Sequence, residues 1–278
     1  MNRCDPRLVK RLRVFVSTSA VFSVVVGLSG LMGRTFHITS LLTWGAAPVL
    51  MKANAGACFV LLGVSLWLLA KKHTRSFPLA RKVAANVLAA IVSLVGLLSL
   101  AQFLIRQDLG IDQFLMPVPP AMATAGVPAG LMSPVSAASF LLLGLALLGI
   151  DWRTRQGRWP AQFLALSAAA GATFGLIGFA FDPLIYAAHL PESLPTAVTF
   201  LVFSTALLCA RPESGLGALL CSQSLGGSLA RRLLPATLIP VLVGWARWQI
   251  GKSGLYSEWS IVVLSSLTTM SLLAVTIA

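Results

Sequence analysis

The sequence predicts an all-α integral membrane protein of about eight transmembrane helices, built as repeated helical hairpins with both termini in the cytoplasm. Three observations predict this class: the composition, the length of the apolar runs and the placement of the basic residues. Apolar residues make up 57% of the 278 residues and charged residues only 10%, whereas a soluble domain carries roughly 25% charge. A surface with so few charges cannot all face water, so most of it must face lipid.

The apolar runs are long enough to cross a bilayer. A spanning helix needs about 20 mostly apolar residues, and in lipid a continuous run satisfies its backbone groups internally as a helix. The eight predicted spans, in order, are Leu12–Met32, Met51–Ala70, Val83–Ile105, Leu131–Ile150, Ala161–Phe181, Leu194–Ala210, Leu233–Ile250 and Trp259–Ala278. Residues 1–11 form a cytoplasmic N-terminus, residues 12–278 form one transmembrane domain, and its hairpins are 12–70, 83–150, 161–210 and 233–278.

The basic residues predict the orientation. Most of the 21 lysines and arginines lie in the N-terminal segment and in the breaks that precede odd-numbered spans. The opposite breaks hold only Arg34, Lys52, Arg106, Arg247 and Lys252. Because lysine- and arginine-rich loops stay in the cytoplasm, both ends of an eight-span chain are expected there. Membrane orientation thus accounts for the net charge of +13, and no nucleic-acid partner is predicted.

Three even-numbered spans open with a similar pattern that ends in phenylalanine. The matching segments are Met51–Phe59, Met132–Phe140 and Glu192–Phe200. A small residue follows each phenylalanine by four positions, at Gly63, Gly144 and Ser204. Small residues let neighbouring helices approach closely. We therefore predict that the phenylalanines and glycines of this repeat pack helices together and do not bind a ligand.

The fifth span carries two glycines four residues apart, Gly171 and Gly175. This spacing places both on one face of a helix. The face is suited to helix packing either within one chain or between two subunits, and the sequence leaves both alternatives open.

No catalytic or cofactor site is predicted inside the membrane. The three histidines, His37, His73 and His189, all fall in loops, so paired axial ligands for a haem on facing helices are unavailable. No cysteine pair has metal-ligand spacing, and no phosphate loop or nucleophile elbow is present. No span carries a charged residue near its centre, which disfavours an ion-coupled pump. We therefore predict no cofactor and no metal, while a transporter of a neutral substrate stays open.

Polar residues at the predicted outer face are the remaining candidates for ligand binding. They are Asp108, Asp112 and Gln113 after the third span, Asp182 and Tyr186 after the fifth span, and Lys52, Asn54 and Glu192 at the starts of even spans. These residues either line an outward cavity or serve as solvated ends and helix caps, and the sequence does not separate the two. Two further groups are expected at the lipid interface: Arg231 and Arg232 on the inner side, and Trp245, Trp248 and Trp259 on the outer side.

These motifs resemble the multi-span N-terminal membrane sensory region (MASE-like) of bacterial PAS-containing sensor histidine kinases and diguanylate cyclases. The resemblance rests on the repeated openings and on the segments Asp108–Gln113, Gly226–Pro235, Val243–Arg247 and Gly254–Tyr256. It implies a sensory input module in the bacterial cytoplasmic membrane, acting as a homodimer within the lipid bilayer. A signal from the outer face or the membrane would pass through the last helix to a cytoplasmic histidine kinase or cyclase.

The end of the sequence agrees with that expectation. The chain stops at Ala278 inside an apolar run with no basic residue after it, so we expect cytoplasmic output domains to follow. Two other classes remain open: a polytopic transporter or channel-like protein, and a structural subunit of a larger membrane complex.

Overall fold

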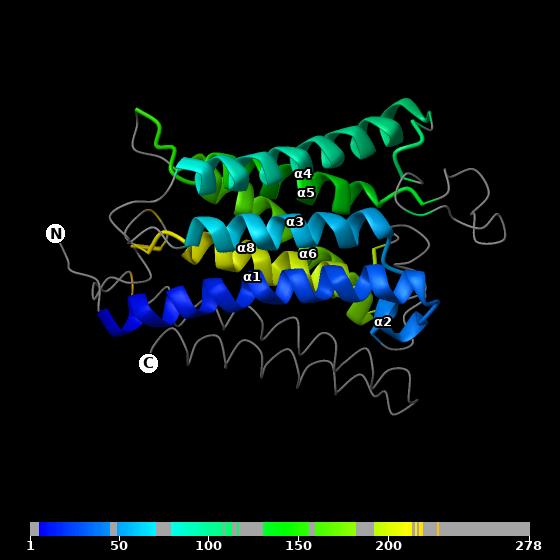
Figure 1. Cartoon of the computed structure of the whole chain (residues 1–278), viewed down its shortest axis with the longest axis horizontal. Coiled ribbons are helices and arrows are strands. Elements are labelled where there is room, and N and C mark those ends of the chain that lie inside the picture. Colours follow the sequence, from blue (N-terminus) through cyan, green and yellow to red (C-terminus); the bar gives the residue numbers. More distant parts are fainter. Residues whose placement is uncertain are drawn as a thin grey trace, which may run out of the picture.

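The computed structural model describes residues 6–44, 49–70, 79–107, 109–112, 116, 130–155, 159–181, 192–212, 215, 217–218 and 227. These residues form helices and no strand, which confirms the all-α class for this part of the chain. The helices are α1 (Pro6–Thr35), α2 (Thr39–Thr43), α3 (Ala53–Ala70), α4 (Leu79–Ile105), α5 (Pro134–Leu148), α6 (Pro160–Phe181) and α8 (Leu194–Cys209), and Figure 1 shows their arrangement.

Four of these helices, α1, α3, α4 and α6, are long and apolar enough to cross a membrane. The prediction of a helical membrane protein is therefore confirmed at this level. Helices α5 and α8 are also apolar but shorter, with 15 and 16 residues. The predicted spans Leu233–Ile250 and Trp259–Ala278 lie outside the described residues, so the number of eight spans stays a prediction.

The helix ends differ from the predicted span ends for two physical reasons. Helix α1 begins at Pro6 and not at Leu12, because the basic residues before the apolar run continue the helix; hydropathy marks only the part suited to lipid. Helix α5 begins at Pro134 and not at Leu131, because Ser133 caps it with its side chain and Pro134 suits the first helical turn.

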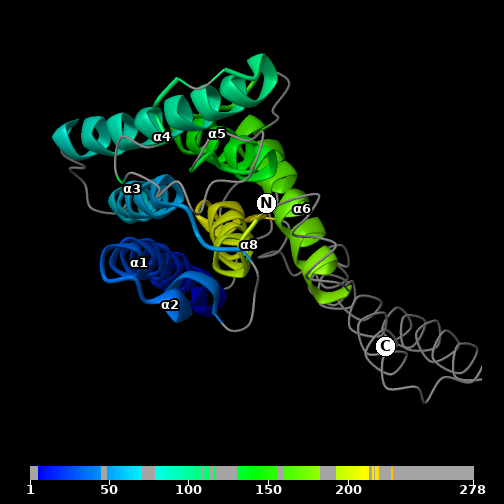
Figure 2. The ribbon, with the colours of Figure 1, turned by 90° about the vertical axis from the view of Figure 1, so that its right-hand side faces the viewer.

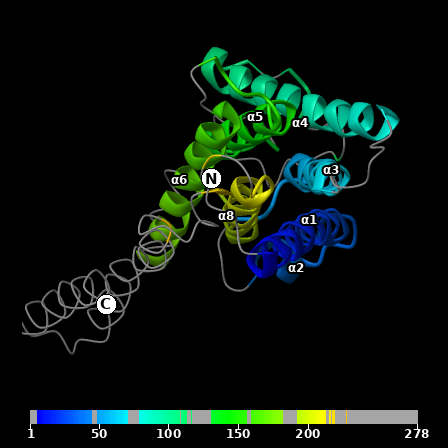
Figure 3. The same cartoon turned by 90° about the vertical axis from the view of Figure 1, so that its left-hand side faces the viewer.

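The three hairpins pack around a shared centre. Within the hairpins, α1 packs on α3, α4 on α5, and α6 on α8. Between the hairpins, α3 packs on α4, α5 on α6, and α8 on α1, so the six helices close into a ring. Figures 2 and 3, which look along the helices, show α3, α5 and α8 on the inside and α1, α4 and α6 around them. We call α3, α5 and α8 the inner helices.

The phenylalanines of the repeat meet at the centre of this ring. The ring centroids of Phe59 and Phe140 lie 4.9 Å apart, those of Phe59 and Phe200 4.9 Å apart, and those of Phe140 and Phe200 4.7 Å apart. All three side chains are 0% exposed. Tilted and edge-on aromatic pairs at this distance contribute about 0.5–1.5 kcal/mol each beyond burial, so this cluster, the Phe triad, joins the three inner helices.

The glycines after the phenylalanines join each inner helix to its outer partner. A Cβ atom on Gly63 would come within 2.6 Å of the Ala20 carbonyl oxygen on α1, and one on Gly144 within 2.8 Å of the Ala89 carbonyl oxygen on α4. No side chain fits at such distances, so only glycine permits this closeness. Ser204, which takes the same repeat position on α8, is buried.

The glycines of α6 lie within the same bundle. The position of a Cβ on Gly171 would be 3.6 Å from the Val135 side chain of α5, an ordinary van der Waals distance. Gly175, one turn further along α6, is buried. Gly171 therefore packs against its own chain, which favours the first of the two alternatives left open by the sequence.

Candidate functional site

The three inner helices begin at the same end of the bundle, beside α2 in Figure 1. Buried polar side chains gather at these N-terminal ends and at the adjoining end of α4. We call them the polar layer: Asn54, Ser99, Gln102, Asp112, Ser133, Ser136, Glu192, Ser193 and Thr196. All of them are less than one-tenth exposed. This is the end of the bundle that the sequence predicts to face outward.

The start of α5 is held by serines. The Ser133 hydroxyl accepts a hydrogen bond of 3.1 Å from the backbone N–H of Ser136, as an N-cap residue does. The Ser136 hydroxyl donates to Glu192 Oε1 at 3.1 Å. Glu192 is 2% exposed and directly precedes α8. This bond therefore joins the starts of two inner helices.

The start of α8 also carries a serine, but without a capping bond to the backbone. Ser193 is the N-cap residue and its side chain accepts no backbone N–H, whereas the Ser193 and Thr196 hydroxyl oxygens share a hydrogen bond of 2.7 Å. One turn further on, the Thr199 hydroxyl donates to the Pro195 carbonyl at 2.6 Å. Pro195 itself lies in the first turn, where its missing N–H has no helical partner to lose.

The start of α3 is built differently. Lys52 stands seven residues before Phe59, the position that Ser133 and Ser193 take before their own phenylalanines. A lysine side chain has no acceptor and cannot cap a helix. Instead, Asp112 from the segment after α4 reaches this end of α3.

The Asp112 carboxylate accepts hydrogen bonds from two amide side chains. Asn54 Nδ2 donates to Oδ1 at 3.1 Å, and Gln102 Nε2 donates to Oδ2 at 2.9 Å. Asn54 Nδ2 also reaches the Ile111 carbonyl oxygen at 3.3 Å. Asp112 is 3% exposed. The carboxylate therefore links the start of α3 to the end of α4.

One cationic side chain, Lys52, stands near this carboxylate, and a second, Arg34, stands near Lys52. Burial lowers the pKa of Lys52, repulsion from Arg34 lowers it further, and attraction to Asp112 partly opposes both effects. Arg34 and Asp112 thus act on the Lys52 ammonium in opposite directions: the guanidinium opposes its charge and the carboxylate stabilises it.

Of the predicted outer-face residues, the structure brings together Lys52, Asn54 and Asp112. Glu192 lies in the same polar layer, where it accepts a hydrogen bond from Ser136. Four other predicted ligand-binding residues lie outside the described residues: Asp108, Gln113, Asp182 and Tyr186. The predicted lipid-interface residues do so as well: Arg231, Arg232, Trp245, Trp248 and Trp259.

Sequence reasoning missed the part of the site that comes from α4. Gln102 and Ser99 lie near the end of the apolar run of the third span. The sequence alone suggests no more than polar residues that a spanning helix tolerates near its end. Their spacing of three residues places them on one helix face, which is a usable signal. Only the fold shows that this face turns toward Asp112, because Gln102 and Asp112 belong to a helix and to a separate segment after it.

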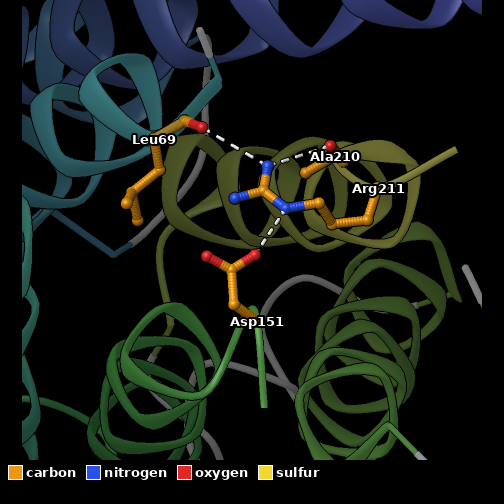
Figure 4. A network of polar contacts seen from close by, with 4 residues as sticks. All are labelled: Leu69, Asp151, Ala210 and Arg211. Atoms are coloured by element: carbon orange, nitrogen blue, oxygen red, sulfur yellow. Dashed lines mark hydrogen bonds and ion pairs between the residues drawn. The ribbon is translucent and has the colours of Figure 1, made fainter. Parts of the chain in front are cut away.

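A second polar cluster lies at the opposite ends of the inner helices. Figure 4 shows Arg211 between Asp151 and Leu69: Arg211 Nε donates to Asp151 Oδ1 at 2.8 Å, and Nη1 donates to the carbonyl oxygens of Leu69 at 3.3 Å and Ala210 at 3.2 Å. Leu69 is in the last turn of α3, Asp151 follows α5, and Arg211 follows α8. One guanidinium thus joins the C-terminal ends of all three inner helices.

In the part of the chain that the structure describes, no group of three or more His, Cys, Asp or Glu side chains is arranged to hold a metal ion. What the site offers is hydrogen bonding and the two carboxylates of Asp112 and Glu192, all buried at the helix ends. Comparison with known protein families, with curated proteins and with solved structures finds no match for this chain.

Proposed function

We propose that this chain is the membrane-embedded sensory module of a bacterial signalling protein, reading a signal at the polar layer and passing it to a cytoplasmic output. One observation carries the proposal. The same three inner helices contribute to the polar layer at one end, to the Phe triad in the middle, and to the Arg211 cluster at the other end. A change at one end therefore acts on helices whose other ends share a single guanidinium.

The physical mechanism is a change in helix packing. Close-packed aromatic rings and glycine contacts do not deform continuously, so small shifts are accommodated as a change between two arrangements. A signal that binds one arrangement more tightly shifts the balance between them, typically by about 1–3 kcal/mol. Asp112 suits this role because it ties α3 to α4, which belong to neighbouring hairpins.

The proposal includes the finer points of topology. The chain crosses the bacterial cytoplasmic membrane eight times, the polar layer faces outward, and both termini lie in the cytoplasm. The excess of lysine and arginine in one set of breaks supports this orientation. A homodimer, and kinase or cyclase domains after Ala278, are part of the same proposal and rest on the family resemblance.

The test joins the chain to its native downstream domains and measures their output. Autophosphorylation is the readout for a histidine kinase and nucleotide synthesis for a cyclase. We expect Asp112→Ala to lock the output at one level, because both amide contacts are lost. The matched control is Thr205→Ala, whose hydroxyl bonds only to Leu201 in its own helix. Output that responds normally in Asp112→Ala contradicts the proposal.

A transporter is the second candidate, because three hairpins around a common centre also suit a substrate path. Among the described residues, the buried polar groups that bear amides or carboxylates lie in the polar layer and not at the Phe triad. Because apolar side chains fill the centre of the bundle, a continuous path for a substrate through it is disfavoured. Uptake of a solute by proteoliposomes that depends on the chain would favour this candidate over the sensory module.

A further inference from the structure

Two buried oxygen atoms on α4 have no hydrogen-bond partner within the described chain: Ser99 Oγ and Gln102 Oε1. Both residues are 1% exposed. They are three positions apart in a helix and therefore lie on one face. Gln102 already donates its Nε2 to Asp112, so its unpaired oxygen lies beside that carboxylate. Buried polar atoms without a partner cost free energy, and this pair indicates a ligand.

The groups around this point are rich in oxygen. Besides the two unpaired atoms, they include the Asp112 carboxylate, the Ile111 carbonyl and the side-chain amide of Asn54. A half-turn of a side-chain amide exchanges its N–H donors for its oxygen acceptor. After such a turn, Asn54 and Gln102 would present oxygen to a carboxylate. Oxygen facing oxygen is repulsive unless a cation lies between them.

The Asp112 carboxylate also favours a cation, and a monovalent one. Gln102 is in the last turn of α4, which ends at Ile105 and attracts positive charge, while the start of α3 at Asn54 opposes it. A single charge is neutralised by Asp112. A double charge would leave an excess positive charge, which the Lys52 ammonium, close enough to be attracted to Asp112, would repel. Carboxylate, carbonyl and hydroxyl oxygens are the ligands that hard cations prefer.

We propose that Asp112, Gln102, Asn54 and Ser99 form a binding site for a monovalent alkali cation. In the bound state the two amides present their oxygens to the cation and Asp112 balances its charge. The Lys52 ammonium is attracted to the same carboxylate and therefore competes with the cation. Binding rests on the geometry of the site alone, whereas its use as the sensed signal rests on the proposed function.

The test is thermal unfolding of the purified chain in lipid nanodiscs. NaCl is raised while choline chloride is lowered to hold the ionic strength constant, so that screening does not change. We expect the midpoint to rise along a single-site saturation curve, because a ligand that binds only the folded state stabilises it. No rise with NaCl, or an equal effect of MgCl2 at matched ionic strength, overturns the proposal.

Three variants and one control sharpen the test. Gln102→Leu and Asp112→Asn should each raise the half-saturating NaCl concentration at least about tenfold, because each removes an oxygen ligand or the balancing charge. Lys52→Met should lower it, because the competing ammonium is gone. The control is Ser204→Ala, which also removes a buried unpaired hydroxyl but at the Gly63 position of the repeat, and it should leave the NaCl curve unchanged.

The remaining outcomes separate this inference from the proposed function. If Gln102→Leu fails to fold, Ser99→Ala is used in its place, because alanine is smaller than serine. We expect this variant to give a weaker but measurable shift in the NaCl curve. An unchanged curve in all of the site variants overturns the cation site. Sodium binding without any change in kinase or cyclase output contradicts the sensory role and leaves the cation site standing.

Discussion

The centre of the bundle and the polar layer are built from the same three repeats but obey different rules. At the centre each repeat supplies the same residue, and Phe59, Phe140 and Phe200 meet as near equals. At the polar layer the repeats diverge. Ser133 caps α5, whereas α3 has Lys52 in that position and its first turn is instead hydrogen-bonded to Asp112. The comparison teaches that the repeated residues determine packing, while the departures from the repeat place the polar chemistry.

The largest expected effect is loss of a ring from the Phe triad. Phe140→Ala should destabilise the bundle by about 3 kcal/mol, near the low end for buried phenylalanines, because lipid already shields the ring in the unfolded chain. Unfolding in lipid measures the change. The control is Phe163→Ala on α6, where the side chain is 58% exposed and should cost far less. Equal costs for the two variants would contradict the packing role of the triad.

The next largest loss of stability is expected when a side chain is added at a close glycine contact between two helices. Gly63→Ala forces a Cβ toward the Ala20 carbonyl, a backbone atom that cannot turn away, so α1 and α3 must separate at a cost of about 1–3 kcal/mol. Gly149→Ala is the matched control, because its Cβ would meet nothing closer than 3.4 Å. If both alanine variants are as stable as the native chain in the same unfolding assay, the packing role of Gly63 is contradicted.

Removing the carboxylate of the polar layer should have a similar or smaller effect. Asp112→Ala leaves the buried Gln102 amide without the carboxylate that accepts its hydrogen bond and leaves Asn54 with only the longer bond to the Ile111 carbonyl, which costs about 1–3 kcal/mol. Ser193→Ala, at the start of α8, should cost about 1 kcal/mol, since it removes the buried hydrogen bond between the Ser193 and Thr196 hydroxyls. If the Asp112 variant is as stable as the native chain, α3 does not depend on the segment after α4.

The ion pair at the opposite helix ends should contribute less. Arg211 and Asp151 are 12% and 33% exposed, and ion pairs open to solvent contribute about 0–1 kcal/mol. Asp151→Asn should therefore cost no more than about 1 kcal/mol, and the loss should shrink at high salt. A loss that is insensitive to salt would show that hydrogen-bond geometry, and not charge, holds this end together.

Replacing Lys52 should give the smallest change in the free energy of unfolding, and this change should stabilise the chain. The lowered pKa of Lys52 means that the fold disfavours the charged ammonium, so Lys52→Met should be slightly more stable than the native chain at neutral pH, by about 0.5 kcal/mol or less. The native chain regains this stability as the pH rises toward 10.5, the ordinary lysine value, because the ammonium loses its proton in both states. Urea unfolding of the native chain and of Lys52→Met, at neutral and at alkaline pH, measures the difference between their free energies of unfolding. A difference that grows with pH contradicts this prediction.

Much of the fold was accessible from the sequence, because apolar runs and basic breaks carry strong signals. The repeat also indicated that the phenylalanines and glycines belong to helix packing. It did not show that the three rings touch each other, since that depends on how hairpins distant in the sequence assemble. Nor did it identify Ala20 and Ala89, the small residues on α1 and α4 that accept the close approach, although each precedes a glycine by seven residues.

The candidate site was accessible only in part. Lys52, Asn54 and Asp112 were expected near one face, because all three flank apolar runs. Gln102 was not expected there, since a single amide inside an apolar run gives no indication of its partner. The bond between Asp151 and Arg211 joins residues 60 positions apart, and neither residue's own neighbourhood in the sequence indicates the other.

The central claim is that the bundle crosses the membrane with the polar layer toward the outside and the Arg211 cluster toward the cytoplasm. Single cysteines at Arg106, just after α4, and at Arg153, just after α5, test it most directly, because both residues are exposed. With the native cysteines replaced, a membrane-impermeant thiol reagent should label Arg106→Cys in intact cells and Arg153→Cys only after the membrane is opened. Labelling of Arg153→Cys in intact cells, or of both positions from one side, would contradict the account.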